Sequence, residues 1–186
     1  MGQVSASGFR RSVICVFIAA GFGLIRPPRC TAAELNLEYQ VKAAFLLNFT
    51  KFVEWPQSAF ASPDAPLEVC ILGEDPFGDF LDRLVSGEIV GGRKVATLRI
   101  KRTPPPKACA VLFIGRRDQD TLKRLSDLGP GVLTVGEGES FLREGGMIAF
   151  VIENRRVRFV INQAAAEHAG LKLSSRLLSV AKSVEK

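Results

Sequence analysis

Residues 67–87, LEVCILGEDPFGDFLDRLVSG, combine a short apolar run with a helix pattern that follows it directly. The run Leu67–Gly73 is too short for a typical helix and ends in glycine, which predicts a buried strand. Asp75 is predicted to be the N-cap of the following helix and Pro76 its first residue, because proline has no N–H that the first turn would leave unbonded. Gly87 is expected to end the helix. A buried strand followed at once by a helix is the repeating unit of an α/β fold.

The same alternation continues along the chain on both sides of this unit. Strands are predicted at Lys94–Ile100, Cys109–Gly115 and Val132–Val135, and helices at Glu38–Trp55, from Asp118 to Gly129, from Asn162 to Ala169 and from Ser174 or Ser175 onward. Met147–Ile152 and Val157–Ile161 are predicted to form a hairpin. We therefore expect a three-layer α/β/α sandwich, with a mainly parallel sheet and a C-terminal antiparallel hairpin. Leu67–Gly73 is expected to lie centrally, as in flavodoxin-like sheets.

The first 33 residues have the layout of a secretory signal peptide. Arg10 and Arg11 precede an uncharged stretch, Ser12–Ile25, and small residues follow at 31–33. The stretch is shorter than the roughly 20 residues that a membrane-spanning helix needs, although an uncleaved N-terminal anchor is an alternative. We expect export to the periplasm, cleavage near Ala33, a single domain over residues 34–186 and no membrane span after cleavage.

The charge of the chain gives no reason to expect a nucleic-acid partner. Four of the 25 basic residues and none of the 19 acidic residues lie in the leader, so the mature chain has a net charge of 21 − 19 = +2. A charge this small, of mixed sign, is typical of an ordinary soluble domain.

Two of the four cysteines, Cys70 and Cys109, remain after removal of the leader. In an oxidising compartment such a pair favours one disulfide, and two buried thiols are the alternative. If the predicted strands end level at Gly73 and Gly115, the two cysteines are three residues out of step. That offset is about 10 Å at 3.3 Å per residue, too far for a bond, so a disulfide would require staggered strands.

The sequence predicts neither an enzyme nor a metal or cofactor site. The single histidine, His168, is expected at the surface or in packing, and no P-loop, metalloprotease or nucleophile-elbow pattern occurs. Gly136–Ser140 is expected to be a turn. Glu74 and Asp75 follow the first strand of the sheet, where ligand clefts form in such folds. Four residues are candidates for a small-molecule cleft at this edge: Glu74, Asp75, Arg116 and Arg117. Helix capping is the alternative role for the two carboxylates.

Two apolar segments are candidates for binding a protein partner. The helical stretch Val41–Trp55 is apolar over more than one face, and the C-terminal segment Leu171–Val180 offers a second apolar stretch. Core packing is the alternative for each side chain. The candidate partner-binding residues are Phe45, Phe49, Phe52, Trp55, Leu171, Leu173, Leu177 and Leu178.

The order of these segments resembles the YfiR family of periplasmic proteins from Tyr39 to Lys182. The matching stretches are VKAAFLLNFTKFVEWP, VCILGEDPFG, GRKV, CAVLFIG, GGMIAFVIENRRVRFVIN and AGLKLSSRLLSVAK. The resemblance implies a regulator that binds and represses the periplasmic sensor domain of an inner-membrane diguanylate cyclase, lowering cyclic-di-GMP and restraining biofilm formation. It also implies a homodimer and a strand-to-strand disulfide between Cys70 and Cys109. A second cysteine pair, which some members carry near the terminal hairpin, is absent from this sequence. A periplasmic small-molecule sensor that acts on another envelope partner is the alternative function.

Overall fold

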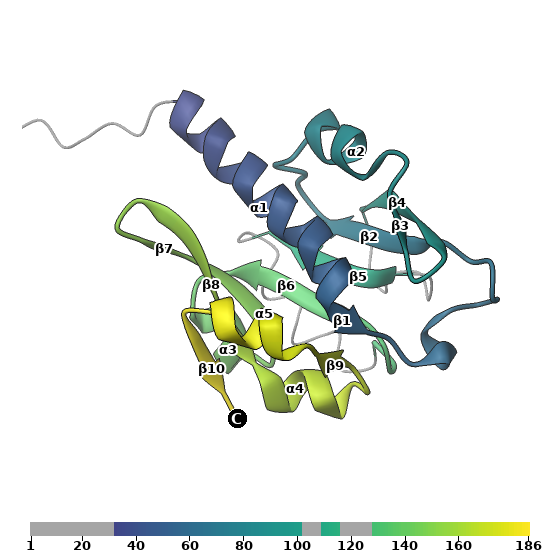
Figure 1. Cartoon of the computed structure of the whole chain (residues 1–186). Helices are drawn as coiled ribbons and strands as arrows, with labels where there is room; N and C mark the ends of the chain where they lie inside the picture. The colour runs from purple at the N-terminus through teal and green to yellow at the C-terminus, as the bar shows by residue number, and fades with distance from the viewer. Residues whose placement is uncertain (1–31, 102–108, 116–127) are drawn as a thin grey trace, which may run out of the picture. The chain divides into compact units, whose positions relative to one another are not determined.

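An eight-stranded sheet organises the chain in this computed structural model, which describes residues 32–101, 109–115 and 128–186 (Figure 1). The strand order is β10-β8-β7-β6-β5-β2-β4-β3, and a separate two-stranded sheet pairs β1 with β9. The described elements are α1 Ala32–Phe52, β1 Val53–Glu54, the 3-10 helix Gln57–Ala59, β2 Leu67–Leu72, α2 Asp79–Val85, β3 Ile89–Val90, β4 Arg93–Ile100, β5 Cys109–Ile114, β6 Leu133–Glu137, α3 Ser140–Arg143, β7 Ile148–Glu153, β8 Arg156–Asn162, α4 Gln163–His168, β9 Lys172–Leu173, α5 Ser175–Val180 and β10 Ser183–Glu185.

The sheet topology confirms the predicted fold class. The strands β4-β2-β5-β6-β7 are parallel, and β2 lies between β4 and β5 as in a flavodoxin-like sheet. β7 and β8 form the predicted antiparallel hairpin. Its turn residues Asn154 and Arg155 have φ angles of 49° and 60°, as a two-residue turn between twisted strands requires.

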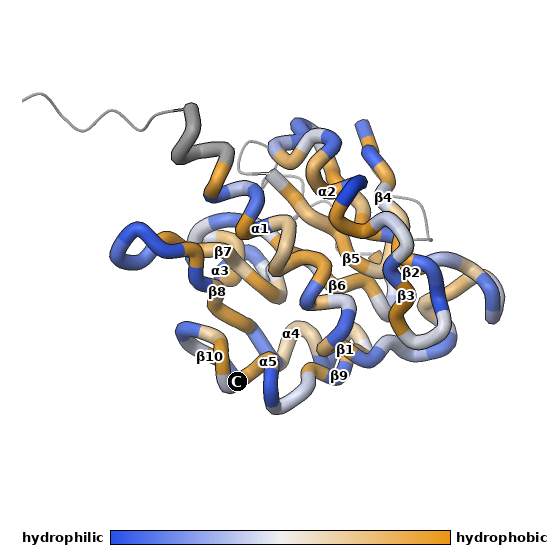
Figure 2. The backbone as a smooth tube through the Cα atoms, turned by 45° about the horizontal axis from the view of Figure 1, so that its top comes forward, coloured by the Kyte–Doolittle hydropathy of each residue, from blue (hydrophilic) through white to orange (hydrophobic). Residues whose placement is uncertain are grey.

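The core lies on both faces of the sheet because successive strand residues point to opposite sides. In β2, Val69 and Ile71 belong to the cluster that α1, α2, α4 and α5 help to cover, whereas Cys70 and Leu72 belong to a second cluster. α1 crosses the first face (Figure 1), and the tube in Figure 2 shows how the apolar strands run beneath it. Among the described residues, α3 covers the second face. The helix predicted from Asp118 lies outside the described residues except near its end.

Local hydrogen bonds explain where the last two helices begin. The Asn162 side chain accepts from the N–H of Ala165 at 2.9 Å, so the helix predicted from Asn162 has this residue as its N-cap. The Ser174 side chain accepts from the N–H of Leu177 at 3.2 Å, so Ser174 is the N-cap of the helix predicted to start at Ser174 or Ser175.

The predicted N-cap at Asp75 is wrong. α2 begins at Asp79 after Gly78, because Asp75 accepts from the N–H groups of Phe77 and Gly78 and holds these residues in a turn. The predicted turn Gly136–Ser140 is also wrong in part. Gly136 and Glu137 continue β6, and Ser140 begins α3.

Candidate functional site

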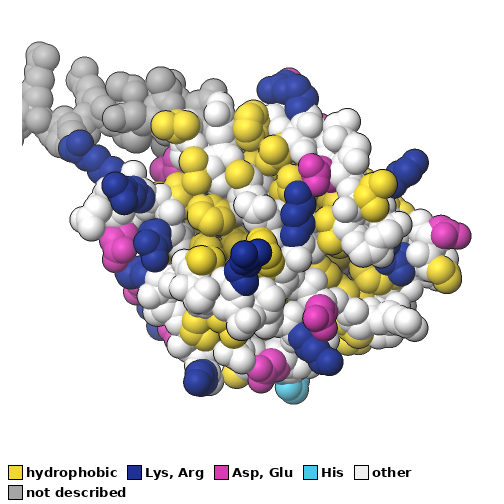
Figure 3. All heavy atoms as spheres, viewed as in Figure 1, with side chains coloured by type: hydrophobic (Ala, Val, Ile, Leu, Met, Phe, Trp, Pro, Cys, Tyr) yellow, Lys and Arg dark blue, Asp and Glu magenta, His cyan; other side chains and the backbone are white. Residues whose placement is uncertain are grey.

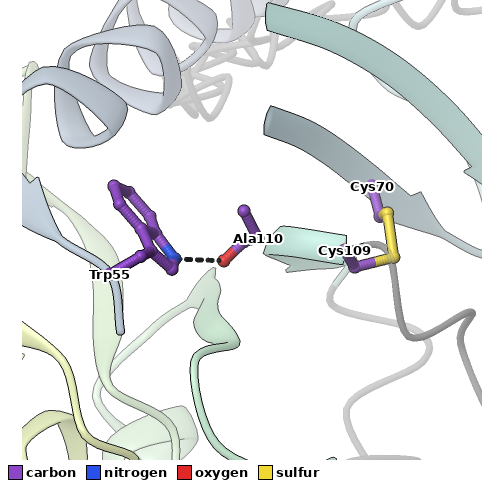
Figure 4. The surroundings of a disulfide bond; sticks show 4 residues. All are labelled: Trp55, Cys70, Cys109 and Ala110. Atoms are coloured by element: carbon purple, nitrogen blue, oxygen red, sulfur yellow. Dashed lines mark hydrogen bonds between the residues drawn. A yellow bond between two sulfur atoms is a disulfide. The ribbon is translucent and has the colours of Figure 1, made fainter. Parts of the chain in front are cut away.

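The structure contains the Cys70–Cys109 disulfide, formed across a β-bulge (Figure 4). Leu72 pairs with Ile114 in the register of β2 and β5, so the strand ends are level and not staggered. The register shifts between Glu68 and Val69, which makes Ala110 an extra residue on β5. This shift brings the two cysteine Cα atoms to 5.7 Å, within the range for a disulfide. The expectation that a bond requires staggered strands was therefore wrong, because it assumed strands without a bulge.

Trp55 forms a hydrogen bond to the bulge residue Ala110, on the side of β5 away from the disulfide. Its indole Nε1–H donates to the carbonyl oxygen of Ala110 at 3.1 Å (Figure 4). Ala110 is fully buried, so its carbonyl needs a hydrogen-bond partner that the irregular strand pairing does not guarantee. Trp55 thus joins the end of α1 to the strand that carries Cys109.

Replacing Trp55 by Phe is expected to lower the free energy of unfolding by about 1–3 kcal/mol, because it leaves a buried carbonyl without its donor. Urea denaturation followed by circular dichroism measures the change, and the m-value shows whether the transition stays two-state. An unchanged midpoint would contradict a stabilising role for this hydrogen bond.

The two segments predicted to bind a partner lie side by side. Val53 pairs with Leu173 between β1 and β9, and the N–H of Ser174 donates to the carbonyl of Phe52 at 3.0 Å. The Arg176 guanidinium lies 5.9 Å from the centre of the Phe52 ring. The end of α1 and the segment Leu171–Val180 therefore form one continuous surface, which we call the α1–α5 surface.

The candidate partner-binding residues differ in how deeply they are buried. Phe49, Leu171 and Leu177 are buried in the core. Five are half-buried: Phe45, Phe52, Trp55, Leu173 and Leu178. Val180, in the same C-terminal segment, is 54% exposed. Of the eight candidates, only the five half-buried ones are accessible to a partner in this structure.

The residues proposed for a small-molecule cleft are not brought together by the described part of the structure. Glu74 is exposed, and Asp75 accepts from Arg99 Nε at 2.9 Å. Arg116 and Arg117 lie outside the described residues. Asp75 therefore has a structural partner that sequence reasoning missed.

Arg99 joins α2 to β4 through several hydrogen bonds. Its guanidinium donates to Asp82 Oδ2 at 2.7 Å and to the Gly78 carbonyl at 2.9 Å, in addition to Asp75. The hydrogen bond from Arg99 lowers the pKa of Asp82 below its ordinary value of 3.8, with help from Thr97 and against the effect of burial. The same bond to Asp82 raises the pKa of Arg99, so the guanidinium stays charged. A planar fork that binds two carboxylates is typical of a structural anchor.

Arg99→Met is expected to lower stability near neutral pH and to reduce the loss of stability in acid. A lowered pKa means that folded Asp82 binds fewer protons than unfolded Asp82. Its stabilising contribution is present above 3.8 and is lost as the pH falls through the folded pKa. Asp82 is partly exposed, so we expect the contribution to be at most about 1 kcal/mol. Unfolding free energies of both proteins from neutral pH to about pH 2 would test this, and equal slopes would contradict it.

A buried ion pair, which sequence reasoning missed, holds α1 against the sheet. Lys42 on α1 and Glu137 at the end of β6 are 3% and 4% exposed and form a salt bridge. Glu38, one turn before Lys42, also contacts the ammonium group, which lies 4.4 Å from the centre of the Tyr39 ring. The spacing of Glu38 and Lys42 was the only local signal, and it is equally typical of an exposed helix pair.

Within the described ranges, no cluster of three or more His, Cys, Asp or Glu side chains has an arrangement that would hold a metal ion. His168 is exposed at the end of α4. None of the described helices is long and apolar enough to cross a membrane.

Comparison with known proteins gives a family match and similar solved structures. The chain has no significant match among curated proteins. One similar solved structure is the crystal structure of a conserved domain protein from Vibrio cholerae O1 biovar El Tor strain N16961, with a TM-score of 0.49 and 10% sequence identity. The match covers 79% of this chain and 60% of that chain, so this chain spans about 60% of that protein's length.

The sequence model of the YfiR/HmsC-like family matches residues 39–182. This is the stretch over which the segment order resembles that family, and it contains the disulfide, the Trp55 hydrogen bond and the α1–α5 surface. The chain therefore belongs to the YfiR/HmsC-like family, whose members are periplasmic regulators of the diguanylate cyclase pathway.

Proposed function

We propose that this protein binds the periplasmic sensor domain of an inner-membrane diguanylate cyclase and represses the enzyme. Repression lowers cyclic-di-GMP and restrains biofilm formation. The protein acts by stoichiometric binding, as a homodimer and without turnover, after export and removal of residues 1–33. Membership of a family of periplasmic regulators supports the pathway.

The observation that carries the proposal is the continuity of the α1–α5 surface. β1–β9 pairing joins the end of α1, which carries the half-buried Phe52, to the segment that carries the half-buried Leu173 and Leu178. Val180, at the end of the same segment, is 54% exposed. Soluble monomeric proteins rarely expose large contiguous apolar patches unless these serve association.

In cells that carry the native cyclase, deletion of the gene is expected to raise cyclic-di-GMP, and expression of the wild-type protein should restore the lower level. Extracted cyclic-di-GMP is measured by mass spectrometry. Unchanged cyclic-di-GMP, together with no binding of the purified protein to the cyclase periplasmic domain, would contradict the repressor function and favour a small-molecule sensor.

Val180→Asp is expected to weaken binding to the cyclase periplasmic domain by about ten-fold or more, because it places a charge in the apolar contact. Leu178→Asp should act in the same direction, with a larger effect on the fold because Leu178 is half-buried. Ile89→Asp is the matched control, since Ile89 is 64% exposed and lies on β3, at the opposite edge of the sheet. Equal affinities of the Val180 and Ile89 variants would place the interface elsewhere.

A further inference from the structure

The tip of the β7–β8 hairpin and the first turns of α1 both extend past the core at the carboxyl end of β6. The Phe45 ring on α1 packs against the rings of Phe150 and Phe159, with centroid distances of 6.1 and 5.3 Å. Val41 lies one helical turn before Phe45 on α1, about 6 Å further toward the start of the helix. Ile152 lies two residues after Phe150 on β7, about 6.6 Å further toward the tip of the hairpin. Val41 is 37% and Ile152 53% exposed.

The first turns of α1 and the tip of the hairpin extend beyond the same end of the sheet. Lys42 on α1 contacts Glu137 at the carboxyl end of β6, and β7 runs parallel to β6. Glu137 pairs with Phe150, so residues 151–158 continue beyond the end of β6. On α1, Leu37 lies a further turn beyond Val41 and is 63% exposed. Three of the five large hydrophobic side chains that are exposed among the described residues therefore lie at this end.

The hairpin also carries exposed positive charge. Arg155, Arg156 and Arg158 are exposed, and Lys and Arg side chains gather where the hairpin lies in Figure 3. No described residue forms an ion pair with any of the three. The hairpin's acidic residue, Glu153, lies 3.5 Å from Lys182. Strand alternation places Arg156 and Arg158 on the face opposite Ile152, with Arg155 in the turn. We call Leu37, Val41, Ile152 and the three arginines the hairpin-tip surface.

We propose that the hairpin-tip surface docks on the anionic phospholipid surface of a bilayer. A guanidinium presents a fork of donors that matches phosphate oxygens, and anionic lipids attract basic groups near the membrane. The aliphatic side chains at the same level would enter the boundary between headgroups and acyl chains. The exposed aliphatic side chains at this tip are separated from one another. A bilayer surface can accommodate such separate side chains, whereas a protein partner would need a pocket shaped to receive them.

This proposal rests on the proposed function for its biological role, because a cyclase in the inner membrane places the regulator next to such a surface. Three arginines and three aliphatic side chains give weak, reversible docking. Weak docking of this kind raises the local concentration of the domain near a membrane-embedded partner. It also orients the domain with α1 and the hairpin toward the bilayer.

The test is co-sedimentation of the protein purified from the periplasm with vesicles of 30% phosphatidylglycerol in phosphatidylcholine, and with vesicles of phosphatidylcholine alone. We expect binding to the anionic vesicles that weakens as salt rises, and little binding to the neutral vesicles. The double variant Arg156→Glu/Arg158→Glu should bind at least about ten-fold more weakly, since each lost charge alone lowers binding about five-fold. Ile152→Asp should also weaken binding. Circular dichroism confirms that each variant is folded.

Two matched controls separate the hairpin-tip surface from general effects of charge and hydropathy. The double variant Arg83→Glu/Lys94→Glu makes the same change in net charge at exposed positions on α2 and β4. Ile89→Asp matches Ile152→Asp, because Ile89 is 64% exposed and lies on the far edge strand. Both controls should bind anionic vesicles as the wild type does.

Failure to bind anionic vesicles, equal binding to neutral vesicles, or equal losses in tip and control variants would each overturn the proposal. If vesicle binding is absent but Ile152→Asp weakens binding to the cyclase periplasmic domain, the surface is a protein interface and the lipid proposal is wrong. The proposed function is tested separately through Val180→Asp, so the two can fail independently.

Discussion

Replacing Cys70 and Cys109 together by alanine is expected to lower the free energy of unfolding by about 4 kcal/mol. The disulfide joins residues 39 positions apart, so it removes many conformations from the unfolded chain. Both cysteines are almost fully buried, at 0% and 1% exposed, so alanine also leaves two small gaps in the core. For a domain of this size such a loss is a large part of the total stability.

Urea denaturation of the wild type and the double variant measures this difference, and the wild type under reducing conditions should unfold at a similarly lowered urea concentration. Thiol labelling of the denatured, non-reduced protein checks the bond itself. Two reactive thiols per mature chain would show that the bond does not form. A double variant as stable as the wild type would show that the link contributes nothing to folding.

Much of the fold was predictable because the relevant signals are local. The run LEVCILG and its counterpart CAVLFIG are apolar over the length of one strand, and the cap residues Asn162 and Ser174 precede short helices. Short strands leave no such signal. β1 and β9 have two residues each, too few for any alternation to appear, and they exist because the end of α1 meets the C-terminal segment.

The interactions of the site were less predictable because they depend on contacts between distant residues. The bulge at Ala110 leaves no pattern in CAVLFIG, yet it brings the cysteines together and creates the carbonyl that Trp55 binds. Asp75 was expected to cap a helix, but Arg99, 24 residues away, determines its environment. Apolar spacing alone did not separate the core residue Phe49 from the accessible Phe52, since both follow the same helical period.

Lys42→Met is expected to lower the free energy of unfolding by about 3 kcal/mol or more, because it removes an ammonium group from a buried carboxylate. Lys42 and Glu137 are 3% and 4% exposed, so water does not readily replace the lost partner. The change also removes the ion pair that links α1 to the end of β6. The ring contacts of Phe45 lie one turn further along α1. We therefore expect the amides of α1 to lose protection from hydrogen exchange before those of the sheet.

Lys51→Met provides the matched control on the same helix. Lys51 contacts Glu88 at 2.8 Å, but the two side chains are 39% and 35% exposed, so its removal should cost at most about 1 kcal/mol. The double variant Lys42→Met/Glu137→Met tests the cause of the effect, because removing both charges leaves no buried carboxylate behind. If the buried charge is what destabilises Lys42→Met, the double variant should be more stable than that single variant. Equal losses from Lys42→Met and Lys51→Met would show that burial does not strengthen this pair, and that other contacts hold α1 on the sheet.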